Sequence, residues 1–173
     1  KRRPRFLFPR FGFGMRRING FEITGGRVGL ADPKLFEREP VRMIELFHMA
    51  QDRDLDIHPQ ALNAVSQNLK RVNGALRENP EAARLFLDIL GSRKDPSLAL
   101  TRMNEAGLLG RFIPEFGRVV AQMQQGLYHV YTVDEHTIRV IGNLWQIEQG
   151  QLSAELPLVT ELMPKLLSRR ELY

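Results

Sequence analysis

Apolar residues recur at helical spacing along most of the chain. Leu62, Val65, Leu69 and Val72 follow one another at intervals of three, four and three residues, which places them on one face of a helix. Three other segments carry similar stripes: Met43, Leu46, Phe47 and Ala50; Ala82, Leu85, Phe86, Ile89 and Leu90; and Leu98, Leu100 and Met103. The pattern predicts a mainly α protein, built as a multi-helical array.

Prolines and glycines mark the ends of these stripes. Proline is favoured at the first helical position, where the N–H that it lacks would have no partner, and helices are expected to begin at Pro40, Pro59, Pro80 and Pro96. A side-chain N-cap precedes proline at Asp32-Pro33, Asn79-Pro80 and Asp95-Pro96. Glycine commonly ends a helix, and the expected stops are Gly74, Gly91 and Gly107. Further helical pieces are expected over residues 108–112, 115–123, 132–150 and 156–167.

The N-terminal part of the chain has a different pattern. Phe21-Glu22-Ile23-Thr24 and Arg27-Val28-Gly29-Leu30 flank the pair Gly25-Gly26. Paired glycines supply the positive φ angles of a tight hairpin turn. We therefore expect one small β-hairpin before the helices.

The net charge of +5 is concentrated at the N-terminus. Residues 1–17 hold seven Lys or Arg and no acid, so the other 156 residues hold 18 basic and 20 acidic side chains, a balance of −2. Interspersed prolines and glycines favour an extended connector. An RNA-binding arm is the alternative, although nucleic-acid-binding domains usually carry a basic stripe on their folded surface.

Composition narrows the location and the chemistry. No apolar run approaches the roughly 18 residues that a membrane helix requires, so no membrane partner is expected. Cysteine is absent, which excludes disulfides and thiolate metal ligands and is compatible with the cytoplasm.

A capped helix entrance stands out near residue 132. Thr132 and Glu135 have the spacing of a capping box, after an extended aromatic and β-branched run at residues 128–131. Asp134 and Glu135 place negative charge where the helix dipole favours it. His136 follows, so this histidine is expected in the first turns of a helix.

A long stretch around these residues carries a family resemblance. Residues 103–116, reading Met-Asn-Glu-Ala-Gly-Leu-Leu-Gly-Arg-Phe-Ile-Pro-Glu-Phe, and residues 131–136, reading Tyr-Thr-Val-Asp-Glu-His, resemble the bifunctional uridylyltransferase/uridylyl-removing enzymes that act on PII nitrogen-regulatory proteins. Residues 36–40 and 85–90 extend the similarity, which covers most of residues 20–145. The resemblance implies UTP and PII as substrates of the complete enzyme. It also implies that His136 is the first metal ligand of an HD phosphohydrolase domain that uses a divalent ion, Mg²⁺ or Mn²⁺.

The remaining parts of both catalytic sites are absent from this sequence. The HD domain's His-Asp pair and later Asp do not occur, nor does a Gly-Ser turn followed by an Asp-x-Asp strand. No complete catalytic site and no stably bound metal are therefore expected.

Asp52, Asp54 and Asp56 alternate as in a calcium loop, but Ile57 and Asn63 replace its required Gly and Glu. These acids are instead expected to end one helix and lead to the next.

The chain ends themselves indicate part of a longer protein. It begins with Lys1, and Ser168-Arg169-Arg170-Glu171 has capping-box spacing just before the last residue. We expect a connector from an upstream nucleotidyltransferase domain over residues 1–17, a β-hairpin and helical linker domain over 18–125, and the N-terminal part of an HD domain over 126–173.

The expected role of the chain is to position the transferase and hydrolase domains. The alternatives are a helical RNA-binding module and a protein-interaction module that would show a large apolar patch and no cleft near His136. Apolar faces within residues 138–145 and 156–167 are expected to pack on the body or to pair between copies.

Overall fold

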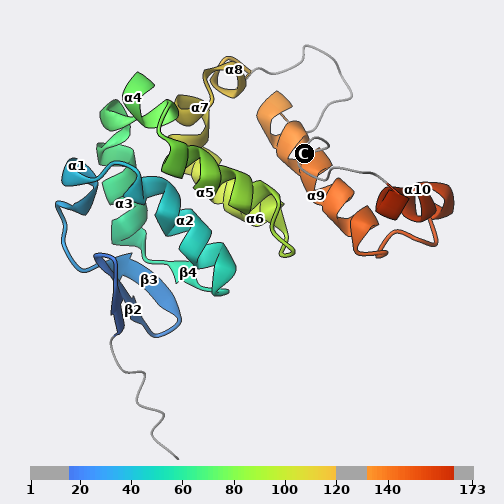
Figure 1. Cartoon of the computed structure of the whole chain (residues 1–173), viewed down its shortest axis with the longest axis horizontal. Coiled ribbons are helices and arrows are strands. Elements are labelled where there is room, and N and C mark those ends of the chain that lie inside the picture. Colours follow the sequence, from blue (N-terminus) through green and yellow to red (C-terminus); the bar gives the residue numbers. More distant parts are fainter. Residues whose placement is uncertain (1–15, 120–131, 166–173) are drawn as a thin grey trace, which may run out of the picture.

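The fold was analysed in a computed structural model, and the description covers residues 16–119 and 132–165 (Figure 1). A small sheet has the strand order β1 (Arg16–Ile18), β2 (Phe21–Thr24), β3 (Arg27–Leu30) and β4 (Asp56–Ile57). The predicted hairpin is confirmed as β2 and β3, which pair antiparallel around Gly25 and Gly26, with φ of +58° and +76°.

The sheet is larger than predicted at both edges. β1 pairs antiparallel with β2, and β4 pairs parallel with β3. Arg16 and Arg17 belong to β1, so the sheet begins two residues before the expected start of the linker domain at residue 18. The expected boundary between residues 125 and 126 lies outside the described residues.

Most of the remaining described residues are helical, as predicted. The helices are α1 (Leu35–Arg38), α2 (Arg42–Asp52), α3 (Pro59–Gln67), α4 (Gly74–Arg77), α5 (Pro80–Leu90), α6 (Pro96–Glu105), α7 (Leu108–Phe112), α8 (Pro114–Gly117), α9 (Val133–Glu148) and α10 (Pro157–Leu162). Two 3-10 turns, η1 (Leu69–Arg71) and η2 (Met163–Lys165), follow α3 and α10. None of these helices is long and apolar enough to span a membrane, within the part of the chain that the structure describes.

Two of the predicted N-caps form as expected. Asn79 Oδ1 accepts from the backbone N–H groups of Glu81 and Ala82 at 2.8 and 3.1 Å. Asp95 Oδ1 accepts from the N–H of Ser97 at 2.8 Å. These bonds satisfy N–H groups that have no partner within their own helix.

The prediction at Asp32-Pro33 was wrong. The Asp32 carboxylate accepts from the N–H of Lys34 at 2.8 Å, and its carbonyl accepts from the N–H of Leu35 at 3.1 Å. Asp32 therefore closes a local turn, and α1 begins at Leu35. Pro40 likewise precedes its helix, which begins at Arg42.

The helix that opens at Pro59 ends earlier than predicted, at Gln67 instead of near Gly74. The backbone N–H of Asn68 donates to the carbonyls of Ala64 and Val65, at 3.2 and 2.9 Å, and the Asn68 side chain also donates to the Ala64 carbonyl at 2.9 Å. The chain then tightens into η1, and Gly74 opens α4 behind an Asn73 cap.

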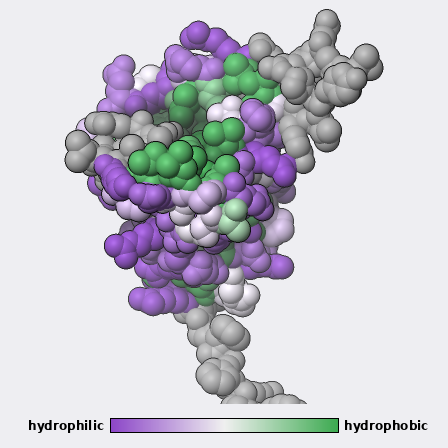
Figure 2. Space-filling model, turned by 90° about the vertical axis from the view of Figure 1, so that its right-hand side faces the viewer, coloured by the Kyte–Doolittle hydropathy of each residue, from purple (hydrophilic) through white to green (hydrophobic). Residues whose placement is uncertain are grey.

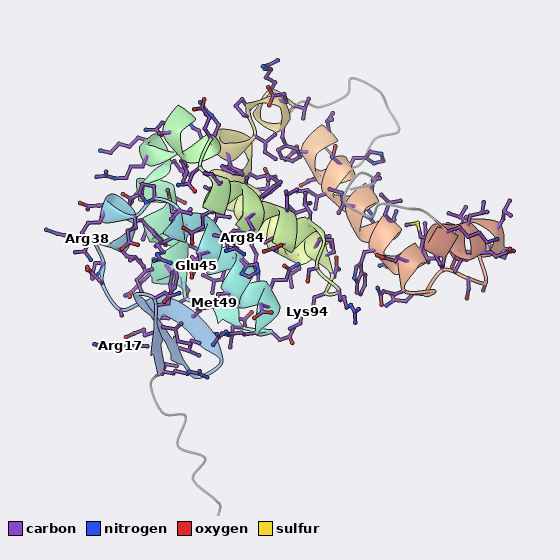
Figure 3. All side chains as sticks on the ribbon, in the orientation of Figure 1. Arg17, Arg38, Glu45, Met49, Arg84 and Lys94 are labelled. Atoms are coloured by element: carbon purple, nitrogen blue, oxygen red, sulfur yellow. The ribbon has the colours of Figure 1, made fainter. Side chains whose placement is uncertain are left out.

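Helix α2 lies at the centre of the core. Its residues Met43, Ile44, Leu46 and Phe47 are buried, and α2 packs against α5, α6 and β3. Burial on several sides is typical of a central helix. Glu45, one turn before the buried Met49, pairs with Arg42 of the same helix (Figure 3).

The C-terminal helices extend from this body on one side. α9 packs along α6, and α10 and η2 pack against α9, at the end farthest from the sheet (Figure 1). Ile138 of α9 joins the core cluster. The expectation that the 138–145 face packs on the body is therefore confirmed for α9.

Candidate functional site

The predicted capping box at the start of α9 is present. The backbone N–H of Thr132 donates to the Glu135 carboxylate at 3.2 Å, and Thr132 caps the third helical residue in return. The N–H of His136 donates to the Thr132 carbonyl at 2.9 Å, the first helical bond of α9. The His136 side chain is exposed, so a well-defined helix start presents this imidazole to solvent.

Asp134 lies in the same turn but has the opposite environment. The residue is 5% exposed, and its Oδ2 accepts from Asn104 Nδ2 of α6 at 2.7 Å. A buried carboxylate is costly unless it is hydrogen-bonded. The contact with Asn104 offsets part of that cost and fixes the first turn of α9 to the end of α6.

A groove of about 540 Å³ runs between α6 and α9 beside this contact. Its walls include Thr101, Asn104, Glu105, Glu135 and Arg139, and His136 is not among its lining residues. A protein-interaction module was expected to lack such a cleft. Because its lining does not include His136, the groove does not decide against that alternative.

The described residues offer no ready-made metal site. They contain no group of three His, Asp or Glu side chains able to hold an ion. An exposed neutral imidazole suits a transition-metal ion as one ligand, and His136 fits that part of a site. His129 lies outside the described residues, and the assignment of His136 as a ligand stays a prediction.

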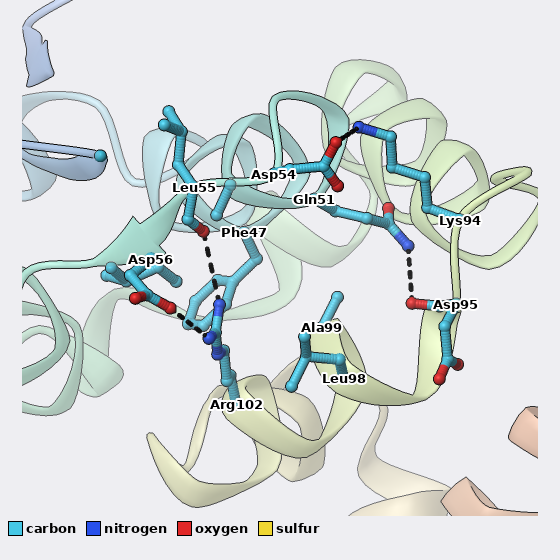
Figure 4. A pocket seen from close by; sticks show the side chains of 13 residues that line it. Phe47, Gln51, Asp54, Leu55, Asp56, Lys94, Asp95, Leu98, Ala99 and Arg102 are labelled. Atoms are coloured by element: carbon cyan, nitrogen blue, oxygen red, sulfur yellow. Dashed lines mark hydrogen bonds and ion pairs between the residues drawn. The ribbon is translucent and has the colours of Figure 1, made fainter.

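The alternating acids serve the fold, as predicted. Asp52 ends α2, while Asp54 and Asp56 lie on the way to α3. Asp54 pairs with Lys94 Nζ at 2.6 Å, and Asp56 pairs with Arg102 at 2.7 Å (Figure 4). Lys94 comes from the loop between α5 and α6 (Figure 3). The two pairs therefore join the segment that follows α2 to the loop before α6 and to the last turn of α6.

The other histidines have structural surroundings. His58 caps α3, because its Nδ1 accepts from the N–H of Gln60 at 3.3 Å. His48 is half-buried on α2. The expectation that neither is a metal ligand stays a prediction.

Among the residues that the structure describes, two side chains have clearly shifted pKa values, and both lie near α1 and α2. The backbone N–H of Lys34 and the guanidinium of Arg38 hold the pKa of Asp32 below its usual value. Hydrogen bonds from Arg42 to Glu45 and Glu39 raise the pKa of Arg42. Neither group is near α9, so these shifts describe the stability of the fold.

The basic arm is mostly beyond the structural description. Of its seven basic residues, Arg16 and Arg17 lie in β1, and residues 1–15 are outside the described part. The RNA-binding alternative therefore gains no support from the described fold.

Comparison with known proteins shows which enzymes this chain is similar to. The chain is 54% identical over 175 residues to a bifunctional uridylyltransferase/uridylyl-removing enzyme of Azospirillum brasilense, covering all of this chain and 19% of that protein. Proteins of the same name from Novosphingobium aromaticivorans and Caulobacter vibrioides are 45% and 47% identical, over 99% and 90% of this chain. The chain spans about a fifth of the length of these curated relatives, 19% and 17% for the last two.

The residues that match a domain family contain most of the buried core. Residues 21–112, from β2 to the end of α7, match the family described as the uridylyltransferase GlnD third domain. This range contains strands β2 to β4, the central helix α2 and the helix α6 on which α9 lies. The chain belongs to the uridylyltransferase GlnD third domain family.

Proposed function

We propose that this chain forms part of a bifunctional enzyme that uridylylates PII signal proteins from UTP and removes the uridylyl group by hydrolysis in nitrogen regulation. The names of the relatives support both activities at the level of the whole protein. This chain spans only about a fifth of those relatives. Its own role is to position the transferase and hydrolase domains.

The docking of α9 on α6 is the observation that carries this role. α6 belongs to the matched domain, and α9 begins with the turn that holds His136. A rigid third domain thus determines where the His136 imidazole lies. This arrangement suits a linker that also forms one wall of the hydrolytic site.

His136 would contribute one nitrogen ligand to a divalent ion, Mg²⁺ or Mn²⁺. Such an ion, when bound, lowers the pKa of water and stabilises negative charge on a phosphoryl oxygen. The chain's own residues supply the helix start, the exposed imidazole and the contact that orients it. The other ligands would come from outside the described residues.

Replacing His136 in the complete enzyme tests this function. His136→Ala should abolish removal of uridylyl groups from modified PII in the presence of Mn²⁺, while transfer from UTP persists. Asn143→Ala, at an exposed position of the same helix, is the matched control and should retain both activities. Undiminished hydrolysis by His136→Ala would refute the assignment.

The chain by itself gives a second test. We expect no uridylyl removal by the 173-residue polypeptide with Mn²⁺ or Mg²⁺, because its described residues offer no cluster of ligands. Turnover by this polypeptide, free of contaminating full-length enzyme, would show that the positioning role is wrong.

A further inference from the structure

Asp134 is buried although it lies in the first turn of a helix. An acid at the second position of a helix benefits from the helix dipole while remaining in water. Asp134 is instead 5% exposed and accepts a 2.7 Å hydrogen bond from Asn104, which lies thirty residues earlier on α6. Burying this carboxylate costs free energy, so it needs a compensating interaction between the two helices.

Asp134 and His136 face opposite sides of α9. Two helical residues are separated by a rotation of about 200° and a rise of about 3 Å. This fits the buried Asp134 and the exposed His136. Any rotation of α9 that broke the Asn104 contact would therefore carry the imidazole to a new position.

Two other contacts hold α9 farther along its length. Gly142 packs so closely on α6 that an added Cβ would lie 3.1 Å from Ser97 Cβ. Trp145 Nε1 donates to the carbonyl of Arg93 at 3.0 Å. As residue numbers rise along α9 they fall along its partner, so the two segments run antiparallel. Asp134–Asn104 is the anchor at the end that carries His136.

We propose that Asp134 is a positioning residue for the hydrolytic centre: through Asn104 it fixes the rotation of the first turn of α9, and hence the place of His136. This inference rests on the proposed function, in which His136 is a metal ligand. It assigns a role to two residues, one in the matched third domain and one in the helix that follows. The linker thereby helps to form the metal site in addition to spacing the domains.

An exchange of donor and acceptor provides the sharpest test in the complete enzyme. Asn104→Asp places two carboxylates face to face and should weaken Mn²⁺ binding about tenfold, the lower end of the loss seen when a group that orients a metal ligand is removed. Asn104→Asp combined with Asp134→Asn restores one amide and one carboxylate and should recover most of the lost affinity. Mn²⁺ binding is measured by electron paramagnetic resonance titration without substrate, and uridylyl removal is assayed in parallel.

Two further variants complete the test. Asn104→Ala removes the donor without adding charge and should also weaken Mn²⁺ binding. It preserves the test if Asn104→Asp fails to fold. Asn143→Ala should bind Mn²⁺ as the parent does. Unchanged Mn²⁺ affinity in Asn104→Ala, or no recovery in a folded exchange variant, would overturn the proposal.

His136→Ala distinguishes failure of this inference from failure of the proposed function. If His136→Ala retains Mn²⁺ binding and hydrolysis, the proposed function of His136 is wrong. If it loses both while the Asn104 variants retain both, only the positioning role is wrong.

Discussion

The indole N–H of Trp145 donates to the backbone carbonyl of Arg93 at 3.0 Å, although 52 residues separate them along the chain. Trp145 is on α9, and Arg93 is in the loop that leads to α6. The sequence contains no other tryptophan. The fluorescence of this indole therefore reports whether α9 is docked on the matched domain.

Gly142→Leu should undock α9. The added side chain would meet Ser97, whose Cβ and Oγ both lie 3.1 Å from an ideal Cβ at position 142. Overpacking of this kind typically costs about 1–3 kcal/mol. We expect a shift of the Trp145 emission to longer wavelength and a lower free energy of unfolding in urea.

Two other substitutions serve as controls for Gly142→Leu. Gly142→Ala adds a tight contact but gains about 1 kcal/mol of helix propensity, so its net effect should be small. Asn143→Leu adds the same side chain at an exposed position and should leave the emission unchanged. Parental emission in Gly142→Leu would contradict the docking described here.

Asn79→Ala should destabilise the matched domain by about 1 kcal/mol, as the loss of an N-cap usually does. Asn79 accepts from two N–H groups at the start of α5, whose Leu85 and Ile89 are buried in the core. Thermal unfolding should show a midpoint lower by about 2–4 °C. Glu78→Ala, at the preceding exposed residue, is the control, and equal midpoints for the two variants would argue against the cap.

The helices of the domain could be predicted because their signals are local. Asn79-Pro80 and Asp95-Pro96 combine a cap with a proline, and both helices begin at the predicted residue. The end of α3 could not be predicted from its apolar stripe. Leu69 and Val72 continue the helical spacing, but the chain tightens into a 3-10 turn at Asn68, whose N–H donates to the carbonyls of both Ala64 and Val65. Apolar periodicity does not distinguish such a tightening from a continuing helix.

The added strands and the partner of Asp134 depend on contacts distant in sequence. β4 consists of Asp56 and Ile57 alone, too short for an alternating pattern, and forms because β3 lies beside it. From the sequence, the Asp134 carboxylate was expected only to interact favourably with the dipole at the start of α9. Its burial against Asn104 follows only from the packing of α9 on α6.

Asp32 should make stability depend on pH in the acidic range. Its pKa is lowered in the fold by the Lys34 N–H and by Arg38. The ionised form therefore stabilises the fold above the ordinary pKa of about 4, and this contribution is lost as the pH falls through the lowered value. Asp32→Asn should be less stable than the parent near pH 6 and should approach it near pH 2.

Urea unfolding at several pH values measures this difference. It should be small and should shrink in high salt, because Asp32 and Arg38 are exposed and solvent screens their interaction. Glu115→Gln is the control, since it also removes one exposed carboxylate. A difference for Asp32→Asn that grows as the pH falls would contradict the assigned direction of the shift.

The apolar face of α10 should make the isolated chain self-associate. Leu156, Leu158, Val159 and Leu162 are 40–66% exposed, and apolar surface gathers on the side of the molecule that carries α9 and α10 (Figure 2). Contiguous exposed apolar side chains favour association, and pairing with a second copy would cover the same face on both partners. Sedimentation velocity should show a weight-average mass that rises with concentration.

Leu158→Lys should weaken this association, because Leu158 is the most exposed of the four, at 66%. A lysine there would have to be desolvated when two copies meet. Ser153→Lys adds the same charge at an exposed position before α10 and should associate as the parent does. A parent chain that stays monomeric at every concentration would show that the α10 face does not pair, and equal association of the two lysine variants would place the contact elsewhere.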